Sequence, residues 1–386
     1  MLSSQRALFD IPGEVCFLNA ASYSPLPLAI IEAGRNAVAR KGRPWQIDAA
    51  FASAQYERTR RAAARLIHAD PQDIALISSV AYGVAAAAKI LPVPKGSRVL
   101  VLADDHSSPV LEWTTRAGDG GFIVETVRRS GNEDWADALL AAIDRTGAAP
   151  IALASISSVH WADGGMVDLG RVASALRAKG AALLIDATQG VGVIDLDVAA
   201  LDPDFVVFPT YKWLLGPYGR AFLYVARRHQ DGIPLEQTSS GRRAVRAEDD
   251  IYISDAGYVA GARRFDMGER DHFIAMEMAS IGMEMMAEWG AAAIGERLAM
   301  LTARLAAGLR DSAEIPDARG RSPHLLCVAF PAGMPNTLID RLAAENIHVA
   351  RRLGRIRLSP HVYNDEADVD RFIAVFVRLM RSSDRA

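Results

Sequence analysis

The chain has 386 residues, of which 50% are hydrophobic and 23% are charged. This length can bury a large core, and it predicts one large and one smaller domain. The net charge of −3 gives no indication of binding to nucleic acid or membranes. The first residues show no signal peptide and no apolar run could span a bilayer, so we expect a cytoplasmic protein. Two cysteines, Cys16 and Cys327, form no disulfide framework.

The N-terminal part contains a segment with two prolines, residues 17–27, which on its own predicts a loop before a helix. An amphipathic helix is predicted over residues 52–68, and an apolar strand follows at 74–77. Ser78 and Ser79 join this strand to an Ala-rich helix. Ser79 is a suitable helix cap, and the free backbone N–H groups with the positive end of the helix dipole also form a phosphate site. The two interpretations are compatible.

Strands and helices then alternate as far as residue 226. A strand that begins at Arg98 is followed by Asp105 and His106, and further strands are predicted within GFIVETVRR and PIALASISS. Taken alone, His106 is a capping or surface residue. The alternation predicts a mostly parallel sheet with right-handed crossovers.

The stretch 183–224 contains the most informative pattern. One apolar run ends in Asp186, Gln189 follows, and a second run at 205–208 leads to Tyr211 and Lys212. Such runs are typical of neighbouring parallel strands, whose carboxyl ends bind ligands. We therefore expect Asp186 and Lys212 to face one crevice. This pair suits pyridoxal 5'-phosphate, because a lysine forms a Schiff base with its aldehyde and a carboxylate keeps its pyridine nitrogen protonated.

After residue 226 the alternation of strands and helices ends. Residues 232–250 are polar and include Arg242, Arg243 and Arg246, which predicts a solvated loop rather than a substrate anion site. The methionines within 273–309 are interpreted as helix packing rather than as a partner surface. We expect an N-terminal segment at 1–16, a large domain at 17–260 and a small α+β domain at 261–386.

These motifs resemble the class V aminotransferase family of fold-type I pyridoxal phosphate enzymes. This group includes cysteine desulfurases, kynureninase and isopenicillin N epimerase-like proteins. The resemblance rests on Asp186 and Gln189, on Lys212, and on the RLSPHVYND sequence from Arg357 onward. It extends in order along nearly the whole chain. It implies an α/β fold-type I transferase that forms a homodimer.

The resemblance implies roles for several residues in cofactor binding. Lys212 would be the Schiff-base lysine and proton carrier, Asp186 would hold the pyridine nitrogen, and His106 would stack on the ring. Gln189 would contact the phenolic oxygen, while Asp105 would be structural. The phosphate would be bound by Ser79, by the amides of Ala81 and Tyr82, by Tyr211, and by Gly268 of a neighbouring subunit. Val80, Ala81, Pro209 and Glu269 depart from the family, so fewer hydroxyl donors are expected there.

The resemblance also implies a substrate side. Asn19, Ala20 and Ala21 would line the pocket, Trp161 would shape it, and Arg357 would clamp the substrate carboxylate through its planar fork. Residues 347–357 contain no cysteine, which disfavours a persulfide-forming desulfurase. Cys327 lies in an apolar run and is expected to be inert.

We therefore predict a pyridoxal phosphate enzyme that acts on an α-amino acid, with no metal. An aminotransferase is the first hypothesis, and a carbon–sulfur lyase or an amino-acid epimerase is the alternative. A binding module without turnover is disfavoured, because Lys212, Asp186, Gln189, His106 and Arg357 occur together. The sequence does not identify the substrate side chain.

Overall fold

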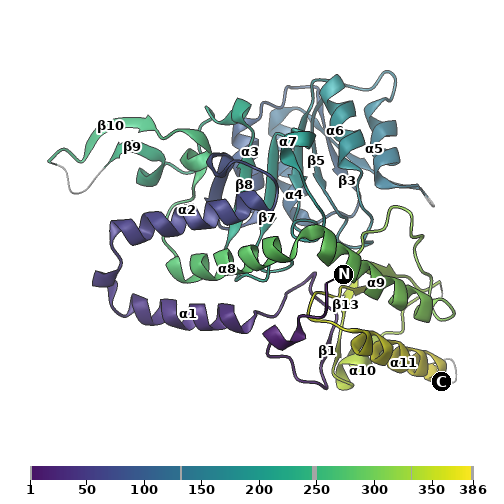
Figure 1. The fold of residues 1–386 in the computed structure, drawn as a ribbon. Coiled ribbons are helices and arrows are strands. Elements are labelled where there is room, and N and C mark those ends of the chain that lie inside the picture. Colours follow the sequence, from purple (N-terminus) through teal and green to yellow (C-terminus); the bar gives the residue numbers. More distant parts are fainter. Residues whose placement is uncertain (1, 131–132, 246–249, 332, 384–386) are drawn as a thin grey trace.

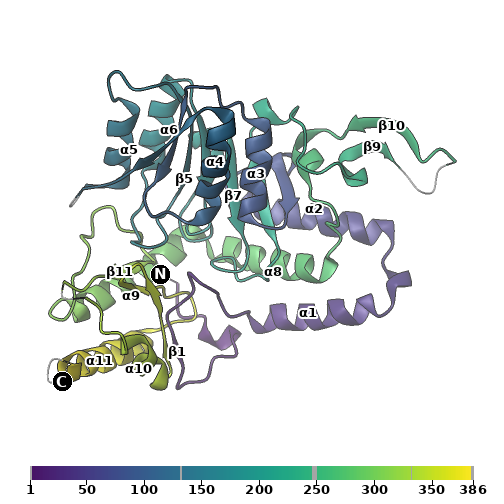
Figure 2. The ribbon, with the colours of Figure 1, turned by 180° about the vertical axis from the view of Figure 1, so that it is seen from behind.

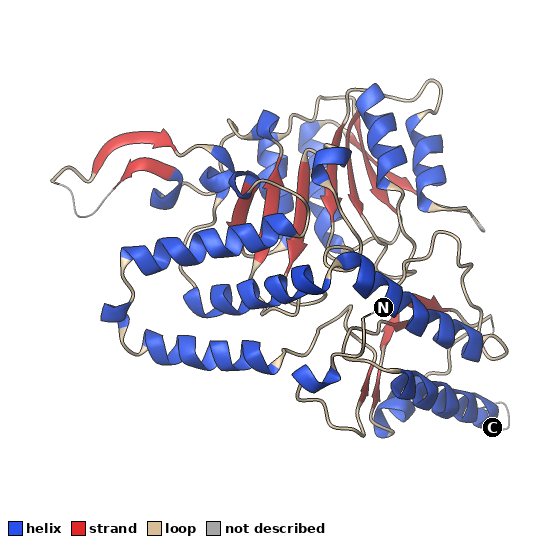
Figure 3. Cartoon of the chain, viewed as in Figure 1, coloured by secondary structure: helices blue, strands red, loops and turns tan. Residues whose placement is uncertain are grey.

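The computed structural model describes residues 2–130, 133–245, 250–331 and 333–383. A seven-stranded sheet with the order β2-β8-β7-β6-β5-β3-β4 forms its centre (Figures 1 and 3). Its strands are β2 (Ile74–Ile77), β3 (Arg98–Leu102), β4 (Ile123–Val127), β5 (Ile151–Ser157), β6 (Ala182–Asp186), β7 (Phe205–Pro209) and β8 (Ala221–Val225).

The strand directions decide which residues meet at one edge of this sheet. Strands β4, β3, β5, β6 and β7 pair in parallel, whereas β8 is antiparallel to both β7 and β2. This confirms the mostly parallel sheet that the sequence predicts. The carboxyl ends of the other strands therefore lie at the same edge as the amino end of β8.

Helices cover both faces of the sheet because its strands are apolar on both sides. Neighbouring residues such as Leu184 and Ile185 belong to different hydrophobic clusters, one on each face. Helices α3 (Val80–Ile90) and α4 (Ser107–Gly120) cover one face (Figure 2). The other face carries α5 (Trp135–Ile143), α6 (Leu169–Ala178) and α7 (Val198–Leu201).

A smaller α+β part contains the C-terminal elements and the first strand of the chain. Strand β1 (Cys16–Phe17) pairs in parallel with β12 (Ile347–His348). Strands β11 (Leu326–Val328), β14 (Arg355–Leu358) and β13 (Ala350–Arg352) form an antiparallel sheet, flanked by α9 (Ala291–Leu309), α10 (Leu338–Ala344) and α11 (Glu366–Ser383). The domain boundaries at residues 16 and 260 stay a prediction.

Three further helices and a hairpin complete the fold. Helices α1 (Leu28–Lys41) and α2 (Ala49–Arg65) pack against α8 (Phe273–Trp289), and buried methionines of α8 fill the contact. Strands β9 (Arg242–Val245) and β10 (Ile253–Tyr258) form a projecting arm (Figure 1). In this arm Arg243 pairs with Asp255, while Arg246 lies outside the described residues. No helix in the described ranges is long and apolar enough to cross a membrane.

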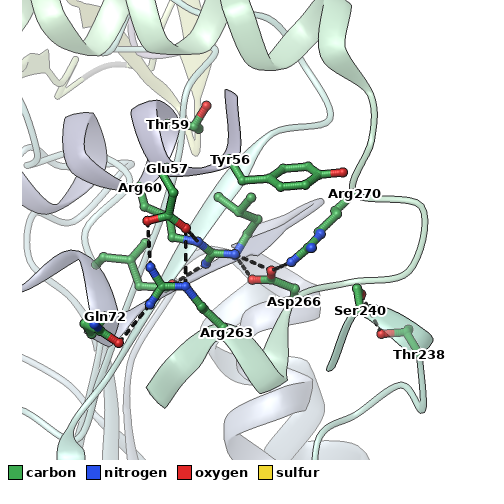
Figure 4. A network of polar contacts seen from close by, with 12 residues as sticks. Tyr56, Glu57, Thr59, Arg60, Gln72, Thr238, Ser240, Arg263, Asp266 and Arg270 are labelled. Carbon is green, nitrogen blue, oxygen red and sulfur yellow. Dashed lines mark hydrogen bonds and ion pairs between the residues drawn. The ribbon is translucent and has the colours of Figure 1, made fainter. Parts of the chain in front are cut away.

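A buried carboxylate ties residues 263–271 to the sheet. Asp266 accepts hydrogen bonds from Arg60 of α2 and from Arg270, and its other oxygen accepts the Leu76 N–H at 2.9 Å (Figure 4). Arg60 and Asp266 are both almost fully buried. Because removing one partner would leave the other charge unpaired in the interior, this cluster holds the segment firmly against β2.

We predict that Gly282→Ala destabilises the protein. A Cβ at Gly282 of α8 would overlap the Leu214 carbonyl oxygen, two residues after Lys212, and backbone cannot move aside as a side chain does. The expected loss is about 1–3 kcal/mol. Gly118→Ala in α4 is the control, because a Cβ there meets nothing within 4 Å. Thermal unfolding measures both, and equal midpoints for the two variants would contradict the close approach.

Candidate active site

One pocket lies at the edge of the sheet where the parallel strands end. The sequence-predicted residues that line it are Ser79, Ala81, His106, Trp161, Asp186, Gln189, Tyr211 and Lys212. They come from the ends of β2, β3, β5, β6 and β7. These residues are far apart in the sequence, and the common direction of the strands brings them together.

Lys212 and Asp186 are both buried, with 7% and 3% of their surface exposed. The pKa of Lys212 is lowered to about 8. Burial is the main cause, Asp186 opposes it, and the positive charges of Arg357 and Arg352 contribute to the lowering. Asp186 accepts the Thr188 N–H at 2.9 Å, which orients its carboxylate. The lysine therefore has a larger neutral fraction at physiological pH than an ordinary lysine, and this fraction can act as a nucleophile or base.

His106 and Trp161 form one wall of the pocket. Their ring centroids lie 5.7 Å apart in an edge-on arrangement. The Trp161 ring N–H donates to the Asp104 carbonyl at 2.8 Å, while His106 caps α4. Burial lowers the pKa of His106, which favours the neutral ring. Asp105 accepts the Ser157 hydroxyl at 2.7 Å, as a structural residue does.

Gln189 is held by contacts from three parts of the chain. Its side-chain oxygen accepts the Trp213 N–H at 2.7 Å, and its amide nitrogen donates to the Ala21 carbonyl at 3.3 Å. Its backbone carbonyl accepts a bond from His324 at 2.6 Å. The amide nitrogen keeps a second N–H, so Gln189 is positioned and can still donate to a ligand.

The N-terminal loop reaches the site through these contacts. Ala21 touches Gln189 through its carbonyl but does not line the pocket, and neither does Asn19. The Asn19 side-chain oxygen is buried and has no hydrogen-bond partner among the described residues. The predicted pocket-lining role of Asn19, Ala20 and Ala21 stays a prediction.

Arg357 lies beside the pocket rather than in its wall. It is 1% exposed and donates to the Ser22 hydroxyl at 2.6 Å and to the Trp161 carbonyl at 3.1 Å. Arg352 donates to the same hydroxyl at 3.0 Å. Ser22 and Arg352 were not expected from the sequence, because the antiparallel pairing of β13 with β14 and the crossing of the N-terminal loop place them there.

The predicted phosphate donors differ in whether they line the pocket and in whether they already have a hydrogen-bond partner. Ser79 caps α3 and accepts the Tyr82 N–H at 3.1 Å, so that amide already has a partner. Neither Tyr82 nor Gly268 lines the pocket, and the Gly268 N–H donates to Glu236. Tyr211 does line it and stacks on Tyr218, with ring centroids 3.8 Å apart. Only Ser79, Ala81 and Tyr211 of the predicted phosphate set therefore border the pocket.

The pocket also contains Arg220, which the sequence interpretation overlooked. Arg220 is 2% exposed, and its Nε and Nη1 have no hydrogen-bond partner among the described residues. The available signal is its place after the Gly216–Gly219 turn and directly before the apolar run of β8. Buried guanidinium donors without partners indicate that this pocket is built for an anion.

Comparisons with known proteins give a consistent result. The family model described as aminotransferase class-V matches residues 16–372. This chain belongs to that family. Since the family uses pyridoxal phosphate, the chain is a pyridoxal phosphate-dependent enzyme, as the motifs predict.

Two curated relatives and one solved structure illustrate the range. A probable cysteine desulfurase from Pyrococcus abyssi is 26% identical over 86% of this chain and 85% of its own length. An isopenicillin N epimerase from Amycolatopsis lactamdurans is 26% identical over 98% of each chain. The fold is similar to an apo cysteine desulfurase from Thermococcus onnurineus NA1, with a TM-score of 0.84, 19% identity, and coverage of 99% of this chain and 100% of that one.

The residues present fit the cofactor. A buried lysine faces a buried carboxylate, a neutral imidazole borders the same pocket, and unpaired guanidinium donors remain for a phosphate. Both cysteines lie outside the pocket wall, and burial raises the thiol pKa of each to about 12. Thiolate chemistry at this site is therefore disfavoured.

We predict that attachment of the cofactor to the apoprotein follows the ionisation of Lys212. Only the neutral amine attacks an aldehyde, so the rate should rise with pH with a midpoint at about 8 and then level off. A lysine with the ordinary pKa of 10.5 would give a midpoint near that value instead. Arg352→Gln removes a positive charge that lowers this pKa, so the midpoint should move to higher pH. Rapid-mixing absorbance measures the rate.

The matched control for this profile is Arg35→Gln, because the Arg35 side chain is 74% exposed and pairs only with Glu32 among the described residues. It should leave the midpoint where the unaltered protein has it. A midpoint near 10 in the unaltered protein, or no movement with Arg352→Gln, would contradict the assigned environment of Lys212.

Proposed function

We propose that this enzyme is an aminotransferase, which moves the amino group of an α-amino acid to a keto acid. The observation that supports this is the presence of a single lysine, Lys212, in a pocket that contains no cysteine among its lining residues. Transamination needs a base that would take the proton from the substrate α-carbon and deliver it again within the same pocket, and Lys212 would fill this role. One base is sufficient for this transfer.

The roles of the other residues follow from their positions. When bound, the cofactor supplies an electron-accepting ring for the electron pair left on the α-carbon. Asp186 would keep the pyridine nitrogen protonated, and His106 would orient the ring by stacking. Gln189 would donate its free N–H to the phenolic oxygen. Asp186 and Gln189 are buried, and His106 is held as the cap of α4. These side chains would therefore need little movement when the cofactor binds.

Arg357 would bind the substrate carboxylate. Its contact with Ser22 is to a hydroxyl, and its Nε is buried without a partner among the described residues. Burial lowers the pKa of its guanidinium to about 10. A carboxylate would compensate this buried charge through a two-point contact, which a hydroxyl cannot do.

A carbon–sulfur lyase or an epimerase is the second hypothesis. Both chemistries use the same core residues, and one relative of this chain is an isopenicillin N epimerase. Epimerisation needs proton delivery to both faces of the α-carbon. Lys212 serves one face, and the His106 ring is assigned to stacking, which favours transamination.

We test this proposal by mixing the holoenzyme with individual amino acids in the absence of any keto acid. An aminotransferase should convert the bound cofactor stoichiometrically to its pyridoxamine form, and a keto acid should restore the original absorbance. A lyase would retain the absorbance while keto acid and ammonia accumulate over many turnovers, and this result would refute the proposal.

Lys212→Ala is the companion variant for this test. Loss of the proton carrier should lower the conversion rate by about 10²–10⁴-fold. Small added amines should partly restore it, which a purely structural defect would not allow. Lys179→Ala is the control, because Lys179 is exposed on the surface and pairs with Asp144.

We also propose a homodimer located in the cytoplasm. The dimer is supported by the aromatic side chains of Tyr23 and Tyr218 beside the pocket, which are 57% and 56% exposed in the single chain. Light scattering should give twice the chain mass of 41.6 kDa. A monomer with full activity would overturn this part of the proposal.

A further inference from the structure

We propose that Arg220 binds the phosphate group of the cofactor through its guanidinium and replaces hydroxyl donors that this chain lacks. This inference rests on the proposed function only in requiring that pyridoxal phosphate occupies the pocket. It assigns a role to a residue outside the motifs that carry the family resemblance.

The antiparallel direction of β8 explains how Arg220 reaches the phosphate side of the pocket. In the register of the sheet, Ala221 lies opposite both Ile77 at the end of β2 and Pro209 at the end of β7. Arg220 comes one residue earlier, at the level of the junction that leads into α3. The Thr210 N–H donates to its carbonyl at 3.1 Å, which fixes its backbone beside the Lys212 turn.

The side chain of Arg220 is buried with incomplete pairing. Its Nη2 donates to the carbonyls of Arg270 and His272 at 3.1 and 3.4 Å. Its Nε and Nη1 have no partner, and no carboxylate among the described residues forms an ion pair with it. Burial lowers the pKa of Arg220 to about 10, although the charges of Asp271 and Asp266 oppose this shift. A buried cation of this kind needs an anion.

The surroundings favour a phosphate over a carboxylate as that anion. The pocket wall near Arg220 contains Ser78, Ser79 and Ala81, at the start of α3, whose dipole also attracts an anion. Val80, Ala81 and Pro209 have no hydroxyl groups, so fewer side-chain donors are present for phosphate oxygens and the guanidinium of Arg220 adds to them. A substrate carboxylate already has a candidate partner in Arg357, which lies with the N-terminal loop at Ser22.

The Asp266 cluster holds Arg220 in this position. Asp266 binds Arg270 (Figure 4) and fixes the segment that continues to His272. The carbonyls of Arg270 and His272 accept hydrogen bonds from Nη2 of Arg220. One edge of the guanidinium is thereby anchored to backbone. The remaining donors stay available without a side-chain carboxylate to neutralise them.

Binding of pyridoxal 5'-phosphate and of unphosphorylated pyridoxal to the apoprotein tests the assignment. Arg220→Met should weaken the affinity for the phosphorylated form by about tenfold to hundredfold, the effect of losing hydrogen bonds to a charged group. The affinity for pyridoxal should not change. Arg220→Lys should recover part of the loss, because it restores the charge without the planar fork. Equilibrium dialysis measures the six constants, two for each of the three proteins.

Two controls separate this role from a structural one. Arg35→Met removes the same charge from an exposed position and should leave both affinities unchanged. Thermal unfolding of the apoprotein should show Arg220→Met to be at least as stable as the unaltered protein, because the variant removes a buried, poorly paired cation. Inorganic phosphate should stabilise the unaltered apoprotein but not the variant.

Several outcomes would overturn the assignment. Equal losses for both forms of the cofactor would indicate a structural role. Unchanged affinity for both, with a raised KM for the amino acid, would place Arg220 on a substrate anion. If the unaltered protein bound neither form, the proposed function itself would fail, which is distinguishable from a failure confined to Arg220.

Discussion

The direction in which each strand of the central sheet runs is the constraint on which this site depends. Parallel strands end at one edge, so the residues that follow them are delivered to the same place regardless of their distance in the sequence. Asp186 after β6 and Lys212 after β7 become neighbours of His106 after β3 for this reason. The apolar strands also exclude water below the pocket, and the resulting burial lowers the pKa of Lys212.

The antiparallel strand β8 places the residue that precedes it, rather than one that follows it, at the edge of the sheet where the pocket lies. It begins at the edge where its neighbours end, and it therefore introduces Arg220 into the pocket from the opposite direction. The positive charge there is not neutralised by a neighbouring carboxylate. Asp266, whose negative charge also acts on Arg220, already accepts hydrogen bonds from Arg60 and Arg270. Nε and Nη1 of Arg220 therefore have no hydrogen-bond partner among the described residues.

The N-terminal loop and the smaller α+β part contribute residues beside the pocket. The N-terminal loop pairs with the C-terminal sheet, and it contacts Gln189 through Ala21 and Arg357 through Ser22. The predicted substrate side therefore combines residues from the first and last thirds of the chain.

The sequence by itself determined the α/β fold class, the mostly parallel sheet and the identity of the cofactor. Apolar runs that end in Asp186 and at Lys212 are local patterns, and such patterns can be read without knowing what lies beside them. The tertiary structure alone decided the direction of β8, the burial of Arg220, and the meeting of Arg352 and Arg357 at Ser22. These features depend on which strands pair and on which donors find partners, and neither is encoded in the spacing of residues along the chain.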